Sequence, residues 1–184
     1  MILLRHGQSE FNLHFSATRR DPGLIDPVLT QLGHAQAAAA AEALAGEAIS
    51  RVIVSPYTRT LQTAAPLLDQ RGMRPEIVPL VRERFAFKCD IGSAPAVLAE
   101  RFPGHVMDHL PAQWWPEERE SEAGVIERAD AFRALMMAAD DWRETVLISH
   151  WGFILALTGQ SLMNGQWIRF DPHAPRPETI IWHP

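Results

Sequence analysis

The chain has 184 residues, of which 47% are apolar and 21% are charged. This length fits a single folded domain, residues 1–184, and the composition excludes a disordered, collagenous or disulfide-scaffold protein. The formal net charge is −5 and the basic residues are not clustered. Nucleic acids and anionic membranes both need a basic face, so neither is expected as a partner.

Arginine supplies nearly all of the positive charge, because Lys88 is the only lysine among 17 basic residues. Any anion site is therefore expected to be built from arginine. The single cysteine, Cys89, can form neither an internal disulfide nor a Cys-based zinc site, which favours a reducing compartment and hence the cytoplasm. No run reaches the roughly 18 apolar residues that span a bilayer, and Arg5 interrupts the apolar start too early for a signal peptide.

Three short segments are apolar without alternation, as central parallel strands are when helices cover both faces of a sheet. These segments are residues 1–4, 52–54 and 145–148. Residues 178–182 are a candidate for a last strand. Helical patterns separate the strands, which predicts an α/β fold: a three-layer α/β/α sandwich around a mostly parallel sheet.

Four helices are predicted, over residues 30–44, 55–69 and 121–139 and after Gly152. Thr30 and Ser55 are N-cap candidates, Pro56 would take the first helical position of the second helix, and Gly46 would end the first. In the third helix, apolar residues recur at intervals of three and four, which predicts one core-facing stripe. The stripe consists of Val125, Ala129, Phe132, Met136 and Ala139.

Residues 84–120 break this regularity. They contain four prolines and the pair Trp114-Trp115, and only residues 96–102 show a helical pattern. The segment is expected to pass over the edge of the sheet and to act as a lid or a substrate-specificity segment. The two tryptophans are expected to anchor it in the core rather than to form a stacking platform.

The residues that follow the predicted strands are those of an anion site. The first strand runs into Arg5 and His6, the second leads to Arg59, and the third runs into His150. Ligands of open α/β sheets bind at the carboxyl ends of the strands, so these side chains are expected in one crevice, next to the amino end of the second helix. Two imidazoles and two guanidiniums predict a phosphate site in which a neutral His can attack phosphorus.

Five segments, in chain order, resemble the motifs of the histidine phosphatase superfamily, the phosphoglycerate-mutase-like proteins. They are RHGQSEFN at 5–12, DPVLTQLGHAQA at 26–37, SPYTRTLQTA at 55–64, VRE at 81–83 and SHWG at 149–152. The resemblance implies a phosphoglycerate-mutase-like fold and an enzyme that hydrolyses small phosphomonoesters through a phosphohistidine, without a metal or other cofactor.

The resemblance also implies a role for each matched residue. His6 would take the phosphoryl group, Arg5, Arg59 and His150 would bind it, and His150 would be protonated. Asn12 would support the bound group and Glu83 would be the proton donor. For His6 to attack, its other ring nitrogen must be held by a hydrogen bond, expected from a backbone carbonyl near residues 5–7.

Two positions leave alternatives open. An alkoxide leaving group requires an acid, which favours a catalytic Glu83, but Arg82, Glu83 and Arg84 could also form a solvated surface run. Trp151 stands where the family motif has glycine, so a bulky aromatic at the pocket wall is expected to restrict the leaving group or stack on it. His14 and its neighbours Arg19 and Arg20 are expected on a loop, as substrate contacts or as solvated residues.

Two other functions compete with the phosphatase. A mutase or phosphotransferase would return the phosphoryl group to a second hydroxyl, which needs a lid that excludes water. Residues 84–120 lack the paired-arginine clamp of glycolytic mutases, which favours hydrolysis. A non-catalytic binding module for phosphorylated ligands is the other alternative, and a turnover assay distinguishes it. The sequence predicts no oligomeric state.

Overall fold

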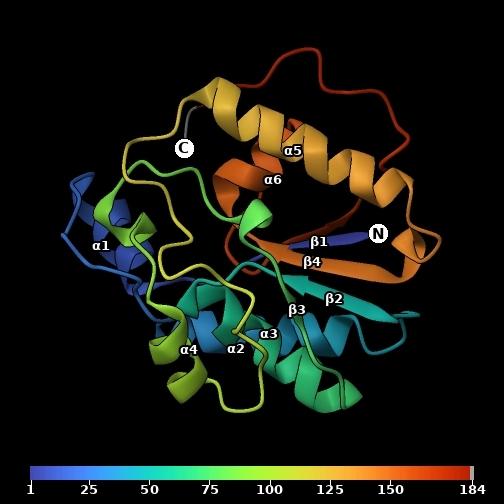
Figure 1. Ribbon diagram of the computed structural model, residues 1–184, viewed down its shortest axis with the longest axis horizontal. Helices are drawn as coiled ribbons and strands as arrows, with labels where there is room; N and C mark the ends of the chain where they lie inside the picture. The colour runs from blue at the N-terminus through green and yellow to red at the C-terminus, as the bar shows by residue number, and fades with distance from the viewer. Residues whose placement is uncertain (183–184) are drawn as a thin grey trace.

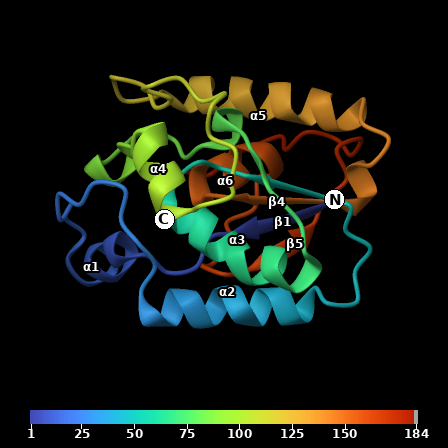
Figure 2. The same cartoon turned by 60° about the horizontal axis from the view of Figure 1, so that its bottom comes forward.

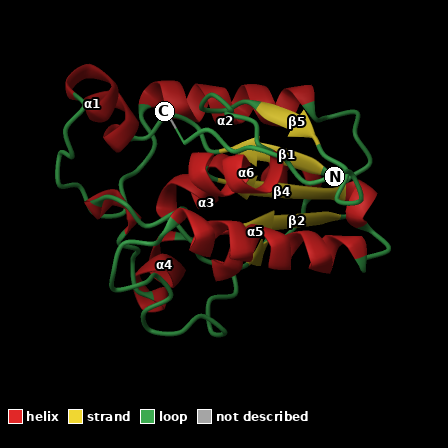
Figure 3. Cartoon of the chain, turned by 90° about the horizontal axis from the view of Figure 1, so that it is seen from above, coloured by secondary structure: helices red, strands yellow, loops and turns green. Residues whose placement is uncertain are grey.

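The computed structural model describes residues 1–182, and a five-stranded sheet forms its centre (Figure 1). The strands are β1 (Ile2–Arg5), β2 (Arg51–Val54), β3 (Glu76–Ile77), β4 (Thr145–Ser149) and β5 (Trp167–Arg169). Their order across the sheet is β3-β2-β4-β1-β5, most of which is visible in Figure 3. The first four run parallel and β5 pairs antiparallel with β1. The predicted mostly parallel sheet is confirmed.

Helices cover both faces of the sheet, which confirms the three-layer sandwich (Figure 2). The α-helices are α1 (Glu10–Thr18), α2 (Gln31–Ala43), α3 (Thr58–Arg71), α4 (Pro95–Arg101), α5 (Glu122–Met137) and α6 (Trp151–Thr158). Figure 1 shows α2 and α3 on one side of the strands and α5 and α6 on the other. None of the described helices has the length and apolar character that crossing a bilayer requires.

Successive side chains of a buried strand point to opposite faces of the sheet, so each strand contributes residues to both hydrophobic cores. In β1, Leu4 packs with the α2 and α3 side chains, whereas Leu3 packs with those of α5 and α6. Leu3 and its partner Leu147 of β4 are both fully buried. The predicted stripe of α5 is buried from Val125 through Met136, which leaves only Ala139, beyond the end of the helix, partly exposed.

The predicted helix ends are partly right. Thr30 caps α2 by accepting a hydrogen bond from the backbone N–H of Gly33, but the helix ends at Ala43 with Leu44 as its C-cap, before Gly46. The predicted cap Ser55 is wrong, because α3 begins three residues later, at Thr58.

A distant carboxylate replaces the local cap of α3. The Asp26 carboxylate accepts hydrogen bonds from both the backbone N–H (2.9 Å) and the hydroxyl (2.6 Å) of Thr58. Asp26 itself has a φ of 41°, a left-handed conformation that places its side chain against the first turn. Ser55 is thereby left free to contact another residue, His150.

Two other predicted elements differ in the structure. Residues 178–182 form no strand, and the last strand is instead β5, at Trp167–Arg169, which pairs with β1. His14 lies on helix α1 rather than on a loop. Ser9 and Asn12 close the amino end of α1 with a capping box, which stabilises a helix whose apolar pattern is weak.

Residues 84–120 contact the edge strand as expected, and several of their apolar side chains are buried in the core. The His109 imidazole is hydrogen-bonded to the carbonyl of Ile77 in β3 at 2.6 Å. Trp114 is buried, donates its indole N–H to the Ser93 carbonyl at 2.9 Å and packs on Tyr57, so it anchors the segment. Only residues near the beginning of the segment, up to Asp90, line the cavity described below.

A close backbone contact brings the turn after β1 against α2. A Cβ atom on Gly7 would lie 2.3 Å from the carbonyl oxygen of Gly33, and one on Gly33 would lie 2.1 Å from that of Gln8. Neither position can hold a side chain without moving the backbone. The two glycines therefore set how closely the His6 turn approaches α2.

Candidate active site

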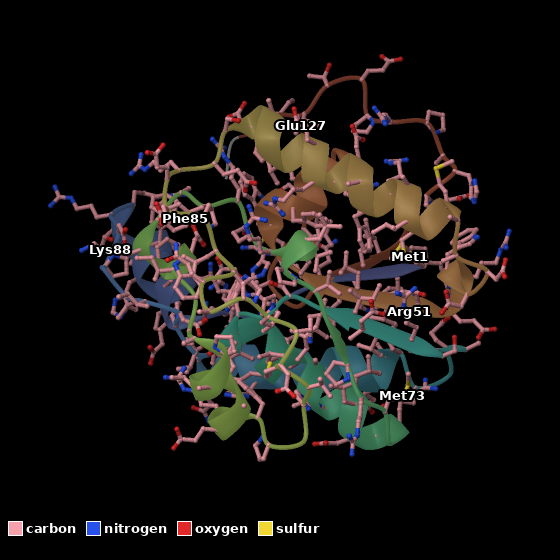
Figure 4. All side chains as sticks on the ribbon, in the orientation of Figure 1. Met1, Arg51, Met73, Phe85, Lys88 and Glu127 are labelled. Atoms are coloured by element: carbon pink, nitrogen blue, oxygen red, sulfur yellow. The ribbon has the colours of Figure 1, made fainter. Side chains whose placement is uncertain are left out.

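A cavity of about 280 Å³ lies at the carboxyl ends of β1 and β2. Figure 4 shows Phe85 and Lys88 on that side of the molecule, opposite Met1 and Arg51 at the amino ends of the same strands. The cavity is lined by Arg5, His6, Ser9, Phe11, Asn12, Arg59, Glu83, Arg84, Ala86, Phe87, Cys89, Asp90, Trp151, Gly152 and Trp182. Of the sequence-predicted site residues, only His150 is not part of this lining.

The ring of His6 is buried and held in one orientation. Its Nδ1–H donates to the carbonyl of Gly7 at 2.7 Å, the backbone hydrogen bond expected from the sequence. Burial, and then the positive charges of Arg59 and Arg5, lower its pKa well below the ordinary value. The imidazole is therefore neutral at physiological pH, with the proton on Nδ1 and a lone pair on Nε2.

The two predicted arginines reach the cavity from different elements. Arg59, in the first turn of α3, is almost fully buried and is fixed by hydrogen bonds to the Cys89 carbonyl (2.9 Å) and the Asp90 carboxylate (3.3 Å). Arg5, at the end of β1, donates to the Leu162 carbonyl. Burial lowers the pKa of Arg5 to about 10, so both guanidiniums are charged at neutral pH.

His150 lies behind His6 rather than on the cavity surface. It is fully buried, and its ring centroid is 5.2 Å from that of His6. Its Nε2 is hydrogen-bonded to the Ser55 hydroxyl at 2.8 Å, while its Nδ1 has no partner among the described residues. Burial, followed by the Arg59 charge, lowers the pKa of His150 well below its ordinary value, which corrects the expectation of a protonated imidazole in the unliganded site.

Glu83 points into the protein rather than forming a solvated run with its neighbours. Its Oε1 accepts hydrogen bonds from the backbone N–H groups of Arg84 (2.8 Å) and Gly152 (2.9 Å). A Cβ on Gly152 would lie 2.5 Å from the same oxygen, so any larger residue here would displace the Glu83 carboxylate. Burial, and then repulsion from the Asp90 carboxylate, raise the pKa of Glu83 to about 7. A carboxyl with this pKa can both donate and accept a proton near neutral pH.

A partly buried arginine on α5 holds the segment that carries Glu83. Arg128 donates to the carbonyls of Leu80 (2.7 Å), Arg82 (3.0 Å) and Glu83 (3.4 Å). It also forms a bidentate ion pair with Glu120, whose Oε1 additionally accepts from Arg82. Sequence reasoning missed Arg128, because its predicted helix gave no sign that this one residue faces residues 80–83.

Asn12 belongs to the cavity wall and to the capping box of α1. Its Oδ1 accepts from the Ser9 backbone N–H (3.0 Å) and from the side-chain amide of Asn164 (3.2 Å). Asn164 also donates to the carbonyl of His6 at 3.2 Å, so it ties the loop before β5 to the His6 turn. No motif marked Asn164 in the sequence. Asp90 was missed for the same reason, although it orients Arg59 and raises the pKa of Glu83.

The described residues offer no ready ligand set for a metal. Within residues 1–182, no three His, Cys, Asp or Glu side chains converge as metal ligands would. The positive charge beside His6 comes from Arg5 and Arg59, which lower its pKa. The arrangement provides a neutral nucleophilic imidazole, two cations and a carboxyl group that titrates near pH 7, which together are suited to phosphoryl transfer.

Comparison with known proteins identifies relatives with this architecture. The family model described as histidine phosphatase superfamily (branch 1) matches residues 1–174. The chain is 33% identical over 177 residues to glucosyl-3-phosphoglycerate phosphatase of Mycolicibacterium vanbaalenii, covering 88% of this chain and 73% of that protein. It is 29% identical over 207 residues to the enzyme of that name from Mycobacterium tuberculosis, covering 99% and 91%. The native structure of a mycobacterial glucosyl-3-phosphoglycerate phosphatase superposes with a TM-score of 0.63 at 27% identity, over 91% of this chain and 87% of that one.

Proposed function

The chain belongs to the histidine phosphatase superfamily and is a phosphomonoester hydrolase, and from that premise we propose that it works through a phosphohistidine formed on His6. One observation carries the proposal. His6, with its Nδ1–H held by the Gly7 carbonyl, lines the same cavity as Glu83, whose pKa is about 7. A nucleophile in its correct tautomer and an acid of suitable pKa thus share one site.

In the first step the phosphoryl group is bound by the guanidiniums of Arg5 and Arg59, and Nε2 of His6 attacks phosphorus. A P–N bond forms as the P–O bond to the alcohol breaks, and the electron pair of that bond leaves with the oxygen. Glu83 in its protonated form transfers its proton to this oxygen, which leaves as an alcohol. The fixed arginines stabilise the charge on the phosphoryl oxygens during transfer.

In the second step water attacks the phosphohistidine. The Glu83 carboxylate takes a proton from the water, a P–O bond forms, and the P–N electron pair returns to Nε2 of His6. Phosphate then leaves with both catalytic groups restored. His150 is neutral in the unliganded site. A bound dianionic phosphoryl group would favour protonation of His150, and the protonated imidazole would then help to balance the charge of that group.

The same proposal assigns the remaining residues. Asn12 supports the phosphoryl site from the cavity wall, and Trp151 contacts the leaving group. Residues 84–90 form the selective part of residues 84–120, since the cavity-lining residues of the segment all lie within them. Three buried side-chain atoms among the described residues have no partner, and two of them, Nε of Arg5 and Nδ1 of His150, belong to predicted site residues and support an anionic ligand, because such atoms are costly without a partner.

Catalysis is proposed to need no metal, because Arg5 and Arg59 supply the positive charge. The proposed compartment is the cytoplasm, which is supported by the lone buried Cys89. A single screen tests the activity: purified protein is assayed with p-nitrophenyl phosphate and a panel of alkyl phosphates, with EDTA present. We expect turnover that His6→Ala abolishes and that His34→Ala, an exposed histidine on α2, leaves unchanged. Loss of all turnover in EDTA that a divalent ion restores would contradict metal independence.

A further inference from the structure

Beyond the phosphoryl-binding groups, the wall of the cavity carries a set of aromatic side chains. Four aromatic rings from separate parts of the chain face it: Phe11 of α1, Phe87, Trp151 at the start of α6, and Trp182. Trp151 and Trp182 meet edge to face with ring centroids 6.2 Å apart, and Phe11 and Phe87 lie 5.3 Å apart. The Trp151 indole N–H donates to the Ser161 hydroxyl at 2.9 Å, which fixes this ring at the rim.

Two polar side chains on this wall, Asp90 and Ser9, already have partners within the protein. Both carboxylate oxygens of Asp90 are engaged, one by Arg59 and the other by the backbone N–H groups of Ala86 and Phe87. The Ser9 hydroxyl donates to Asn12. A sugar hydroxyl buried against these engaged groups or against the aromatic rings would lose its water without gaining a partner, which weakens binding.

The positively charged side chain on this wall, Arg84, also favours a ligand with an aromatic ring. The Arg84 guanidinium lies 5.1 Å from the centroid of Trp182, while its Nε donates to the Glu120 carbonyl at 3.1 Å. Arg84 is therefore held as a flat, charged surface beside an indole, and such a surface stacks well on an aromatic ring.

We propose that the preferred substrates of this enzyme are phosphomonoesters whose alcohol carries an aromatic ring, which packs against Trp151 and Trp182 beside Arg84. This inference rests on the proposed phosphatase function of the same site and adds the substrate class to it. Trp151 and Trp182 are then the specificity-determining residues, and the phosphoryl-binding residues do not distinguish one alcohol group from another.

The test needs substrates that differ in the alcohol but not in leaving-group reactivity. 2-Phenylethyl phosphate, n-butyl phosphate and glucose 6-phosphate are all esters of primary alcohols, so their intrinsic reactivities are similar. For the wild-type protein we expect kcat/KM for 2-phenylethyl phosphate to exceed that for glucose 6-phosphate by about tenfold or more, as one well-formed aromatic contact provides. The butyl ester should fall between them.

Substitutions at the rim should then remove the preference. Trp151→Gly, which installs the glycine of the family motif, and Trp182→Ala should each reduce the ratio of the two kcat/KM values severalfold. Trp142→Ala removes an indole that lies outside the cavity lining and should leave the ratio as it is.

The outcomes separate this inference from the function on which it rests. Failure of the wild-type protein to hydrolyse even p-nitrophenyl phosphate would overturn the phosphatase proposal. Turnover of that ester with a ratio of one or below would overturn the aromatic preference alone. A ratio that is high but unchanged by both rim substitutions would overturn the assignment to Trp151 and Trp182.

Discussion

Replacing the carboxyl of Glu83 by an amide should separate proton transfer from phosphoryl binding. In Glu83→Gln the side-chain carbonyl can still accept the hydrogen bonds from Arg84 and Gly152, so the segment keeps its position. What the variant loses is the proton of a group whose pKa is about 7. General acid catalysis typically contributes about 10²–10⁴-fold, so kcat for an alkyl phosphate should fall by that amount.

The leaving group determines how much of this loss is seen. p-Nitrophenolate needs little protonation, so its ester should lose far less activity in Glu83→Gln than an alkyl ester does. The assay is kcat for both esters with the wild-type protein, the variant and the matched control Glu122→Gln, in which a half-exposed carboxylate outside the cavity lining is replaced. Equal losses for the two esters in Glu83→Gln would refute the assignment of Glu83 as the acid.

Three further results are expected. The pKa of Glu83 is raised from about 4.5 to about 7 in the folded protein, so ionisation of Glu83 opposes folding as the pH rises through this interval. At pH 8, Glu83→Gln should therefore have a free energy of unfolding up to about 3 kcal/mol higher than that of the wild-type protein. At pH 4 the two proteins should be almost equally stable, and denaturant unfolding at both pH values measures the difference. Arg128→Met should lower kcat for alkyl esters more than for p-nitrophenyl phosphate with little change in KM, and Arg128→Lys should restore part of it; parallel losses for both esters would mean that Arg128 does not position the acid. Gly152→Ala should displace the Glu83 carboxylate and lower kcat while inorganic phosphate still inhibits, whereas full activity would refute the close contact.

Local sequence signals predicted the elements that carry such signals. The central strands were recognised because segments buried on both faces are uniformly apolar, as Leu3, Ile53 and Leu147 are. Thr30 and the stripe of α5 were recognised because a cap and a helical period are short-range features. The strands β3 and β5 were missed because they span two and three residues and have no apolar run.

Long-range contacts explain the errors. Ser55 and Pro56 have the local form of a helix start, but the Asp26 carboxylate caps the chain at Thr58 instead. Helix α1 has a weak apolar pattern, and its Phe11 and Phe15 rings pack against Phe87 from a distant segment. No short-range pattern contains such partners.

The residues of the site also divide into those with a local sequence signal and those that act through long-range contacts. The sequence singled out cavity-lining residues that lie at the end of a strand (Arg5), directly after it (His6) or in the first turn of the following helix (Arg59). The residues that orient them were not found from sequence. Arg128, Asn164 and Asp90 act through backbone carbonyls or through a single side chain, and such contacts leave no spacing that a sequence reveals.

Trapping the covalent intermediate tests the central claim most directly. Enzyme mixed rapidly with a phosphorus-radiolabelled ester and quenched in alkali should retain label on the protein, because a phosphohistidine is stable in base. Acid should release this label, and His6→Ala should abolish it while His34→Ala retains it. Label that survives acid, or normal turnover by His6→Ala, would contradict a phosphohistidine on His6.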